Sequence, residues 1–354
     1  MKKYEKEMLQ RRLDNEEDMI EDLKIVYEQA SKDCAEKIAA LSARTDMENI
    51  QSIVYQKRYQ QTLKKQIDGI LEILYANEFE RISDYLGMAY EDGFLEALYS
   101  INKQGIPLMF PIDQQAVVNA IQTDSKISTD LYTRLGEDIK ELKTSIRAEI
   151  SRGISNGSTY NEIAKKIALG MNSPFNKAFN NAIRISRTEG NRIANQSAMD
   201  ACRKAKDRGA DIVRQWDSTL DGHTRPSHRK VDGEIREIDE PFSNGLMFPS
   251  DPKGKASEVI NCRCSLLQRA RWALEGGMSK MNNFTKEIVV FDNEKSYADF
   301  KKDFYSKENV LYMNYVETLE ERHNTKNFEK LLASMTEREY SHYRKLLDAT
   351  PIYK

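Results

Sequence analysis

The sequence WDSTLDGHTRPSHRKVDG at residues 216–233 decides the character of this chain, because the helical pattern of the preceding residues stops there. Apolar and polar side chains alternate over Ile212-Val213-Arg214-Gln215-Trp216-Asp217, which predicts a strand. The dipeptide Asp232-Gly233 predicts a hairpin turn within residues 231–235. Turn-forming residues extend the region to residue 254, namely Gly222, Pro226, Gly245, Pro249, Pro252 and Gly254. We therefore expect a small, loop-rich α+β element held between helices.

Upstream of this element, apolar residues recur at spacings of three and four, which is typical of amphipathic helices. The first stripe consists of Ile20, Leu23, Tyr27, Ala30, Cys34, Ile38 and Leu41. The second consists of Ile53, Leu63, Ile67, Leu71, Leu74, Phe79, Ile82 and Leu86. Two interpretations of these long helices stay open. They pack on one another as a hairpin or bundle, or they form an arm whose stripe is covered by another subunit.

Proline and glycine interrupt the chain after the second stripe. A break at residues 105–111 is followed by helical sequence over about 128–151. Ser158 or Thr159 is the expected N-cap of the next short helix, with Glu162 completing the cap.

A long helix is expected from about Asn176 to Arg208, closed by Gly209. After the small α+β element, Gly276-Gly277 is a natural linker, and a helical tail rich in Tyr and Phe follows from Asn293. Between the two, the apolar spacing predicts a helix through Leu266, Ala270, Trp272 and Leu274.

The expected fold class is mainly α with a small α+β domain. Long N-terminal helices precede a central helical region that leads into the compact loop-rich β element, and a helical C-terminal tail follows. The predicted units are an N-terminal helical arm or hairpin at 1–104, a linker at 105–126, a central domain at 127–275 and the C-terminal tail at 276–354.

Charge and cysteine content restrict the class of protein. The 354 residues include 54 basic and 56 acidic side chains, giving a formal net charge of −2. A protein dedicated to coating nucleic acid would show a basic excess. The N-terminus is too charged for a signal peptide, and no apolar run is long enough to span a bilayer, so we expect a cytosolic protein without a membrane partner. We expect Cys34 and Cys202 to be small buried hydrophobes, and no secreted disulfide framework.

Two blocks of residues carry a recognisable pattern. The first is Ser186-Arg187-Thr188-Glu189, followed by Arg192, Ala194, Asn195 and Ala198, and the second is the 216–233 run closed by Asn261-Cys262-Arg263-Cys264. Their order and spacing resemble the phage Mu F-like minor head (head morphogenesis) family over roughly Ile163 to Leu267, with a motif core at 186–264. The expected structural motif residues are Arg187, Thr188, Glu189, Trp216, Asp217, Asp221, Thr224, Arg225, His228, Asp232, Gly233, Asn261, Cys262, Arg263 and Cys264.

The resemblance implies a minor structural protein of a tailed-phage head. It implies binding to the portal protein, with the major capsid protein, a scaffolding protein and packaged DNA as further candidate partners. The implied location is the virion head near the portal vertex, after a period in the host cytoplasm during assembly. An effect on DNA packaging or ejection is part of the same expectation.

The polar motif residues are expected to cross-link a region whose core is too thin to fix its loops. Arg225 and Arg263 carry planar donors suited to carboxylates, and the candidate acceptors are Asp217, Asp221, Asp232 and Glu189. Trp216 is the expected apolar anchor, with Phe248 and Pro249 as candidate neighbours. Gly233 suits a positive φ in the turn.

The resemblance also raises zinc binding, because relatives carry C-x-x-C in place of this T-R-P-S-H and a histidine before the final cysteines. Here Val259 occupies that histidine position, which leaves His228, Cys262 and Cys264, with His223 as a candidate fourth ligand. These departures favour a lost site replaced by a polar network. We therefore expect no cofactor, with zinc as the alternative.

Catalysis is the other alternative, because His228 with Cys262, or Glu189 with Arg187, are residue types that enzymes use. The sequence lacks a nucleophile elbow, a phosphate-binding glycine loop and an H-E-x-x-H motif. A non-enzymatic protein is therefore expected. A metal-dependent or Cys-His enzyme domain and a DNA-contacting ejection protein remain the alternatives.

Overall fold

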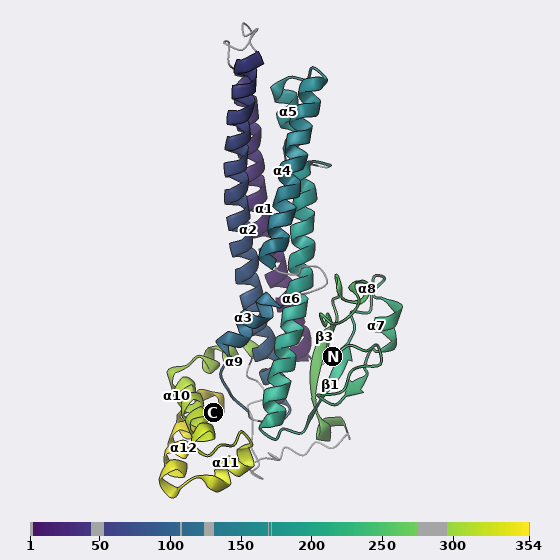
Figure 1. The fold of residues 1–354 in the computed structure, drawn as a ribbon. Helices are drawn as coiled ribbons and strands as arrows, with labels where there is room; N and C mark the ends of the chain where they lie inside the picture. The colour runs from purple at the N-terminus through teal and green to yellow at the C-terminus, as the bar shows by residue number, and fades with distance from the viewer. Residues whose placement is uncertain are drawn as a thin grey trace. The chain divides into compact units, whose positions relative to one another are not determined.

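The computed structural model describes residues 3–43, 53–106, 108–123, 131–168, 170, 172–274 and 296–353. These residues are mainly α-helical, with one small antiparallel sheet, as the sequence predicts (Figure 1). None of the helices in these ranges combines the length and the apolarity that a bilayer span requires. The predicted linker at Gly276-Gly277 and the predicted start of the tail at Asn293 lie outside the described residues.

The elements follow one another in this order: α1 (Lys3–Ala39), η1 (Ala40–Ala43), α2 (Ile53–Lys103), α3 (Gln114–Gln122), α4 (Leu131–Ser155), α5 (Tyr160–Ile167), α6 (Pro174–Asp207), β1 (Ile212–Asp217), α7 (Pro226–Lys230), β2 (Ile235–Arg236), α8 (Ala256–Val259), β3 (Ser265–Ala270), η3 (Arg271–Leu274), α9 (Tyr297–Phe304), α10 (Lys307–Arg322), α11 (Phe328–Ser334), α12 (Glu337–Ala349) and η4 (Pro351–Tyr353). The predicted long helix and the predicted strand are confirmed as α6 and β1. Gly209 follows α6 with a φ of 92°, a conformation that glycine adopts at low cost.

The described chain forms two compact units, each assembled from separate segments. The sheet unit combines Met1–Leu13, Gly87–Ile121 and Gly190–Lys354. The helical unit combines Asp14–Leu86 and Gln122–Glu189. Each unit is described by itself below.

In the helical unit, segments of α1, α2, α4 and α6 run side by side (Figure 1). The Tyr27 ring on α1 lies 5.6 Å from the Phe179 ring on α6, and the Tyr27 hydroxyl donates to Glu78 on α2 at 2.9 Å. Arg147 on α4 binds Asp68 on α2 at 2.8 Å. The bundle interpretation is confirmed for these helices, because the buried stripe members are Leu23, Tyr27, Ala30, Cys34, Ile38, Leu63, Ile67, Leu71, Leu74, Ile82 and Leu86.

The short helix α5 packs on α4 within the same unit. Thr159 is its N-cap, and its side chain and that of Glu162 form the reciprocal capping box that the sequence predicts. The close approach depends on Gly153, because a Cβ there would lie 2.4 Å from Cγ1 of Ile163.

The sheet has the order β2-β1-β3, with both outer strands antiparallel to β1. β1 pairs with β3 along its whole length, from Ile212 opposite Ala270 to Asp217 opposite Ser265. The predicted hairpin is wrong in its connection. A turn forms at Gly233, with a φ of 76°, but it leads into β2, and the whole segment 218–234, which includes α7, separates β1 from β2.

The predicted helix through Leu266 and Ala270 is also wrong, because residues 265–270 form β3 and only residues 271–274 are helical, as η3. Five of the six β3 residues are buried, so neither face of the strand is marked by exposed polar residues. A strand that is buried on both faces need not alternate apolar and polar residues, and its apolar spacing then fits a helix as well as a strand.

Helices α2 and α6 contribute their C-terminal parts to the sheet unit, where they meet at a glycine. A Cβ added to Gly93 would lie 2.3 Å from the Ser197 hydroxyl and 2.4 Å from the Ala194 main-chain oxygen. The C-terminal helices join this unit through α9, whose Phe300 ring lies 5.2 Å from Tyr99 on α2. Cys202 on α6 is fully buried, as predicted.

Candidate metal-binding site and its polar network

Trp216, at the C-terminal end of β1, anchors the site. Its indole is fully buried and lies edge-on to Phe242 at 5.2 Å and to His228 at 5.3 Å between ring centroids. The indole Nε1 donates to Ser218 Oγ at 3.0 Å, and Ser218 donates in turn to the His228 main-chain oxygen at 2.8 Å. The predicted apolar anchor is therefore a buried aromatic group that also fixes the backbone of α7.

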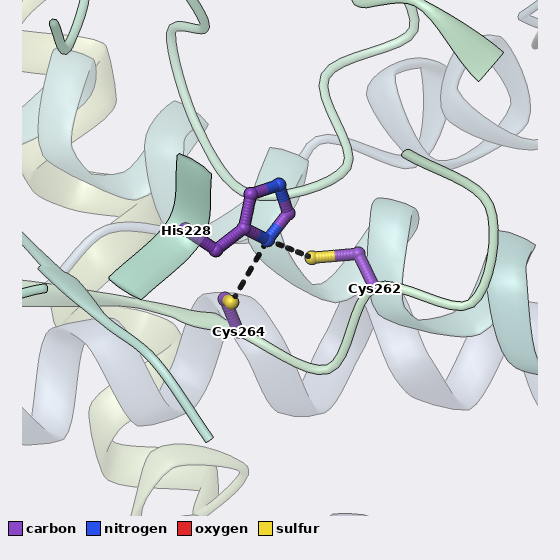
Figure 2. Close-up of side chains that lie close together, drawn as sticks. All are labelled: His228, Cys262 and Cys264. Atoms are coloured by element: carbon purple, nitrogen blue, oxygen red, sulfur yellow. Dashed lines mark hydrogen bonds between the residues drawn. The ribbon is translucent and has the colours of Figure 1, made fainter. Parts of the chain in front are cut away.

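Three potential metal ligands converge, as Figure 2 shows, and one of them, His228, lies edge-on to the Trp216 indole. His228 comes from α7, while Cys262 and Cys264 come from the segment between α8 and β3. The Nδ1 atom of His228 lies 3.3 Å from Cys264 Sγ and 3.7 Å from Cys262 Sγ. All three side chains are buried, and no other group of three such ligands occurs in the ranges that the structure describes. His223 is exposed on the loop before α7 and lies outside this cluster.

The second ring nitrogen of His228, Nε2, lies close to a carboxylate. The His228 Nε2 atom lies 3.1 Å from Glu258 on α8, although the alignment is not that of a hydrogen bond. Ser227 donates to the same Glu258 oxygen at 2.7 Å and holds it in place. A carboxylate behind the ring is the usual outer partner of a histidine whose other nitrogen binds a metal.

The two thiols share one environment and differ in proton affinity. A hydrogen bond from Cys264 holds the pKa of Cys262 at about 7, below the ordinary thiol value of 9. The same hydrogen bond, together with burial, raises the pKa of Cys264. Cys262 therefore carries most of the thiolate character, which is the form that binds metals or attacks electrophiles.

Residues 144–267 match the family model described as phage Mu protein F like protein. Minor head protein GP7 of Bacillus phage SPP1 is 28% identical over 213 residues, which are 58% of this chain and 67% of GP7. Over residues 144–267, the chain is similar to the phage Mu F-like minor head family.

A second relative of the chain carries an enzyme name. The NAD(+)--arginine ADP-ribosyltransferase EFV of Enterococcus faecalis (strain ATCC 700802 / V583) is 26% identical over 313 residues. These residues are 86% of this chain and 61% of that protein, so the chain spans less than two thirds of its enterococcal relative. No solved structure matches the chain.

The paired charges of the Mu F-like motif are Asp221 and Arg263. Arg263 grips the Asp221 carboxylate with both guanidinium nitrogens, at 2.6 and 2.8 Å, and thereby lowers the pKa of that carboxyl. Arg225 was expected to bind a carboxylate, but it donates to the Ile260 main-chain oxygen instead. Its role is to tie α7 to the segment before the cysteines.

Other motif residues of this segment hydrogen-bond to its backbone or adopt the positive φ that its turns require. Asp232 accepts the Ser218 main-chain N–H at 2.8 Å. Asp217 is half-buried, and this burial raises the pKa of its carboxyl. Gly233 and Asn261 have φ values of 76° and 54°, in the left-handed region that Gly and Asn tolerate best.

The Arg187-Thr188-Glu189 block of the Mu F-like motif lies on α6, in the last residues of the helix that belong to the helical unit. Arg187 binds Glu16 on α1 at 2.6 Å, and the Thr188 hydroxyl donates to the Arg184 main-chain oxygen. Glu189 is buried. The structure therefore assigns this block to a different compact unit from the His228 cluster.

Asn195, further along α6, fastens the helix to the sheet within the sheet unit. Its amide donates to the Cys264 main-chain oxygen at 3.1 Å and accepts the Leu266 main-chain N–H at 2.8 Å. One side chain thus satisfies two backbone groups next to the candidate ligands. Arg192, one turn earlier, is buried and donates to the Ala120 main-chain oxygen at 2.8 Å.

Sequence reasoning missed Arg214, which lies in β1 and is fully buried. Its guanidinium donates to the main-chain oxygens of Glu237, Glu240 and Met247. The Cζ atom of Arg214 lies 5.2 Å from the centroid of the Phe242 ring. Burial lowers the pKa of Arg214 to about 10. The one available signal was an arginine two residues from the apolar Ile212 and Trp216 on the predicted strand, which fits an exposed edge position equally well.

Proposed function

We propose that this protein is a minor structural component of a tailed-phage head that binds the portal, and the capsid interior around it, during procapsid assembly. Support comes from the family match and from the name of the SPP1 relative. The observation that carries the proposal is structural. The motif residues Asp221, Arg225, Asp232 and Arg263 are engaged in holding backbone and one another, which is what a rigid binding module needs.

The portal proposal is tested with whole particles and with purified components. Heads assembled in the host are expected to contain this chain, and the full-length chain is expected to bind the purified portal protein of the same phage. Truncating α1 is a poor test, because its stripe is part of the bundle core. Heads that lack the chain, together with no binding to portal or capsid protein, would refute the proposal.

The proposal includes that the chain is not an enzyme, in spite of the enterococcal relative's name. About two fifths of that relative has no counterpart in the aligned region. The test incubates the full-length chain with radiolabelled NAD+ and an arginine-rich acceptor protein. No transfer of label is expected, and transfer that depends on the chain would overturn this part of the proposal.

DNA contact during ejection is the further alternative, and it has a measurable signature. Binding carried by phosphate contacts weakens steeply as salt rises. The near balance of 54 basic and 56 acidic residues favours weak binding at physiological ionic strength. Tight, salt-sensitive binding of the full-length chain to duplex DNA would favour the ejection role instead.

A second candidate function is zinc binding by His228, Cys262 and Cys264. Zinc bonds of about 2.0 Å to nitrogen and 2.3 Å to sulfur, at tetrahedral angles, place the two ligand atoms about 3.5 Å apart. The observed Nδ1–Sγ distances of 3.3 and 3.7 Å lie on either side of that value. The Glu258 carboxylate behind the ring supports the same assignment. Zinc would act here as a structural link between α7 and the segment before β3.

Metal analysis of the full-length chain decides this point. About one zinc per chain is expected, falling close to zero in Cys262→Ser, while Cys34→Ser retains the metal because Cys34 belongs to the helical unit. A chain purified with added zinc that holds less than about a tenth of an equivalent would refute zinc binding. The cluster would then be a buried thiol–imidazole network.

A further inference from the structure

The loop between β1 and α7 exposes the apolar side chain of Leu220 to solvent. Leu220 is 67% exposed, which is the largest exposure among the large hydrophobic residues that the structure describes. Gly222 and His223, which follow it, are also exposed. An isolated exposed leucine is common on protein surfaces, so the support beneath it decides whether it has a function.

The loop is fixed by polar contacts to Asp221, the residue that follows Leu220, and these contacts are called the clamp below. The Asp221 carboxylate accepts hydrogen bonds from both terminal nitrogens of the Arg263 guanidinium. Arg229 on α7 donates to the Asp221 main-chain oxygen at 2.7 Å. The His223 main-chain N–H donates to the Asp221 carboxylate at 2.9 Å. Asp221 is therefore held by two other segments of the chain, at Arg263 and at Arg229, and by a turn within its own loop.

The residue before Leu220 is fixed as well. The Thr219 hydroxyl donates to the Arg263 main-chain oxygen at 2.7 Å. Thr224 closes the loop, since its hydroxyl donates to the Thr219 main-chain oxygen. Motif residues thus immobilise both flanks of a leucine whose own side chain projects into solvent. Such pre-organisation lowers the entropic cost of binding.

Helix α7, which follows the Leu220 loop, carries exposed basic side chains, while the exposed Asp232 lies at the base of the loop, where it accepts the Ser218 main-chain N–H. Arg229 and Lys230 are exposed on α7, and neither has a carboxylate partner among the described residues. Arg225 donates to a main-chain oxygen and has no carboxylate partner among the described residues. Asp221 and Arg263 neutralise each other. A partner surface that fits this face combines an apolar pocket with carboxylates at its rim.

We infer that the clamped loop at residues 218–224 is a docking knob, with Leu220 inserting into an acidic-rimmed apolar pocket of a protein partner in the phage head. This inference rests on the proposed function and names where the partner binds. Arg263 is a positioning residue, because it acts by holding Asp221 and thereby Leu220. A few well-packed residues at the centre of an interface carry most of the binding energy, and truncating one of them typically weakens binding by tenfold or more.

The test measures binding of the full-length chain to two probes, the purified portal protein and the purified major capsid protein of the same phage. Leu220→Ala is expected to weaken binding to one of them by about tenfold, and Leu220→Asp by about a hundredfold or more, with unchanged circular dichroism and melting temperature. The matched control is Ile73→Asp, which changes an isoleucine that is 64% exposed in the helical unit. This control is expected to bind as the wild type does.

Arg263→Gln separates positioning from direct contact. It is expected to weaken binding in the wild-type background and to have little further effect in Leu220→Ala, because the clamp then presents no leucine. Wild-type binding that is insensitive to Leu220→Asp, or that is replaced by duplex DNA binding lost on changing Arg229, would overturn the docking knob while leaving the head-protein assignment intact. Absence of wild-type binding to both probes, together with heads that lack the chain, would instead refute the proposed function.

Discussion

Glu78 places a carboxyl inside the helical unit, where its charge is costly. The side chain is fully buried, accepts a hydrogen bond from Tyr27, and has one oxygen without a hydrogen-bond partner in the described structure. Burial raises the pKa of Glu78 from 4.5 to about 8, and the nearby carboxyl of Asp138 contributes to the increase. At neutral pH the folded protein therefore holds this carboxyl mostly in its protonated form.

Glu78→Gln replaces this group by a neutral side chain of the same shape. Because the folded pKa lies above the unfolded value, wild-type stability falls as pH rises from about 4.5 to about 8 and is constant above that. At about 1.4 kcal/mol per tenfold change in proton affinity, the full cost is about 5 kcal/mol. Glu78→Gln removes this cost, so its advantage over wild type is expected to be near zero at pH 4.5, about 3 kcal/mol at pH 7 and about 5 kcal/mol at pH 9.

The assay is urea unfolding of the two full-length proteins at intervals from pH 4.5 to 9, followed by helical circular dichroism. The matched control is Glu80→Gln, which changes an exposed glutamate two residues further along α2 and is expected to show no comparable pH-dependent advantage. A Glu78→Gln advantage that is constant with pH, or that shrinks as pH rises, would show that Glu78 is not a buried neutral acid.

Further predictions concern close packing and the buried arginine. Gly93→Ala is expected to destabilise the protein by at least 1–3 kcal/mol, since the new Cβ would meet the main chain of α6, whereas Gly87→Ala on the same helix has no atom within 4 Å and is expected to be neutral or stabilising by up to about 1 kcal/mol. Thermal unfolding of both variants checks this, and equal melting temperatures would contradict it. Arg214→Met is expected to cost about 3–5 kcal/mol because it leaves three main-chain oxygens without their donor. Urea unfolding measures this loss, and a change below about 1 kcal/mol would show that the guanidinium does not hold the loops.

Parts of the site follow from residue types that stand close together in the motif. A tryptophan at a strand end is expected to anchor a small core, and Trp216 does so. The pair Asp221 and Arg263 was among the predicted carboxylate–guanidinium combinations. Glu258 was not predicted, because it reaches His228 only after α8 has folded against α7. No local pattern marks a carboxylate that becomes a neighbour through tertiary folding.

The sequence by itself determined the long helices, a capped helix start at Ser158 or Thr159, the strand over Ile212–Asp217 and the resemblance to a motif family, because these depend on periodicity and on near neighbours along the chain. Only the tertiary structure decided that β3 is a strand, that Glu78 rather than Phe79 lies in the bundle core, and that His228 meets two cysteines while His223 stays in solvent. The physical reason is the same in each case. Strand pairing, burial of a charge and convergence of ligands depend on contacts between residues far apart in the chain, whose strength is set by the surrounding protein rather than by local spacing.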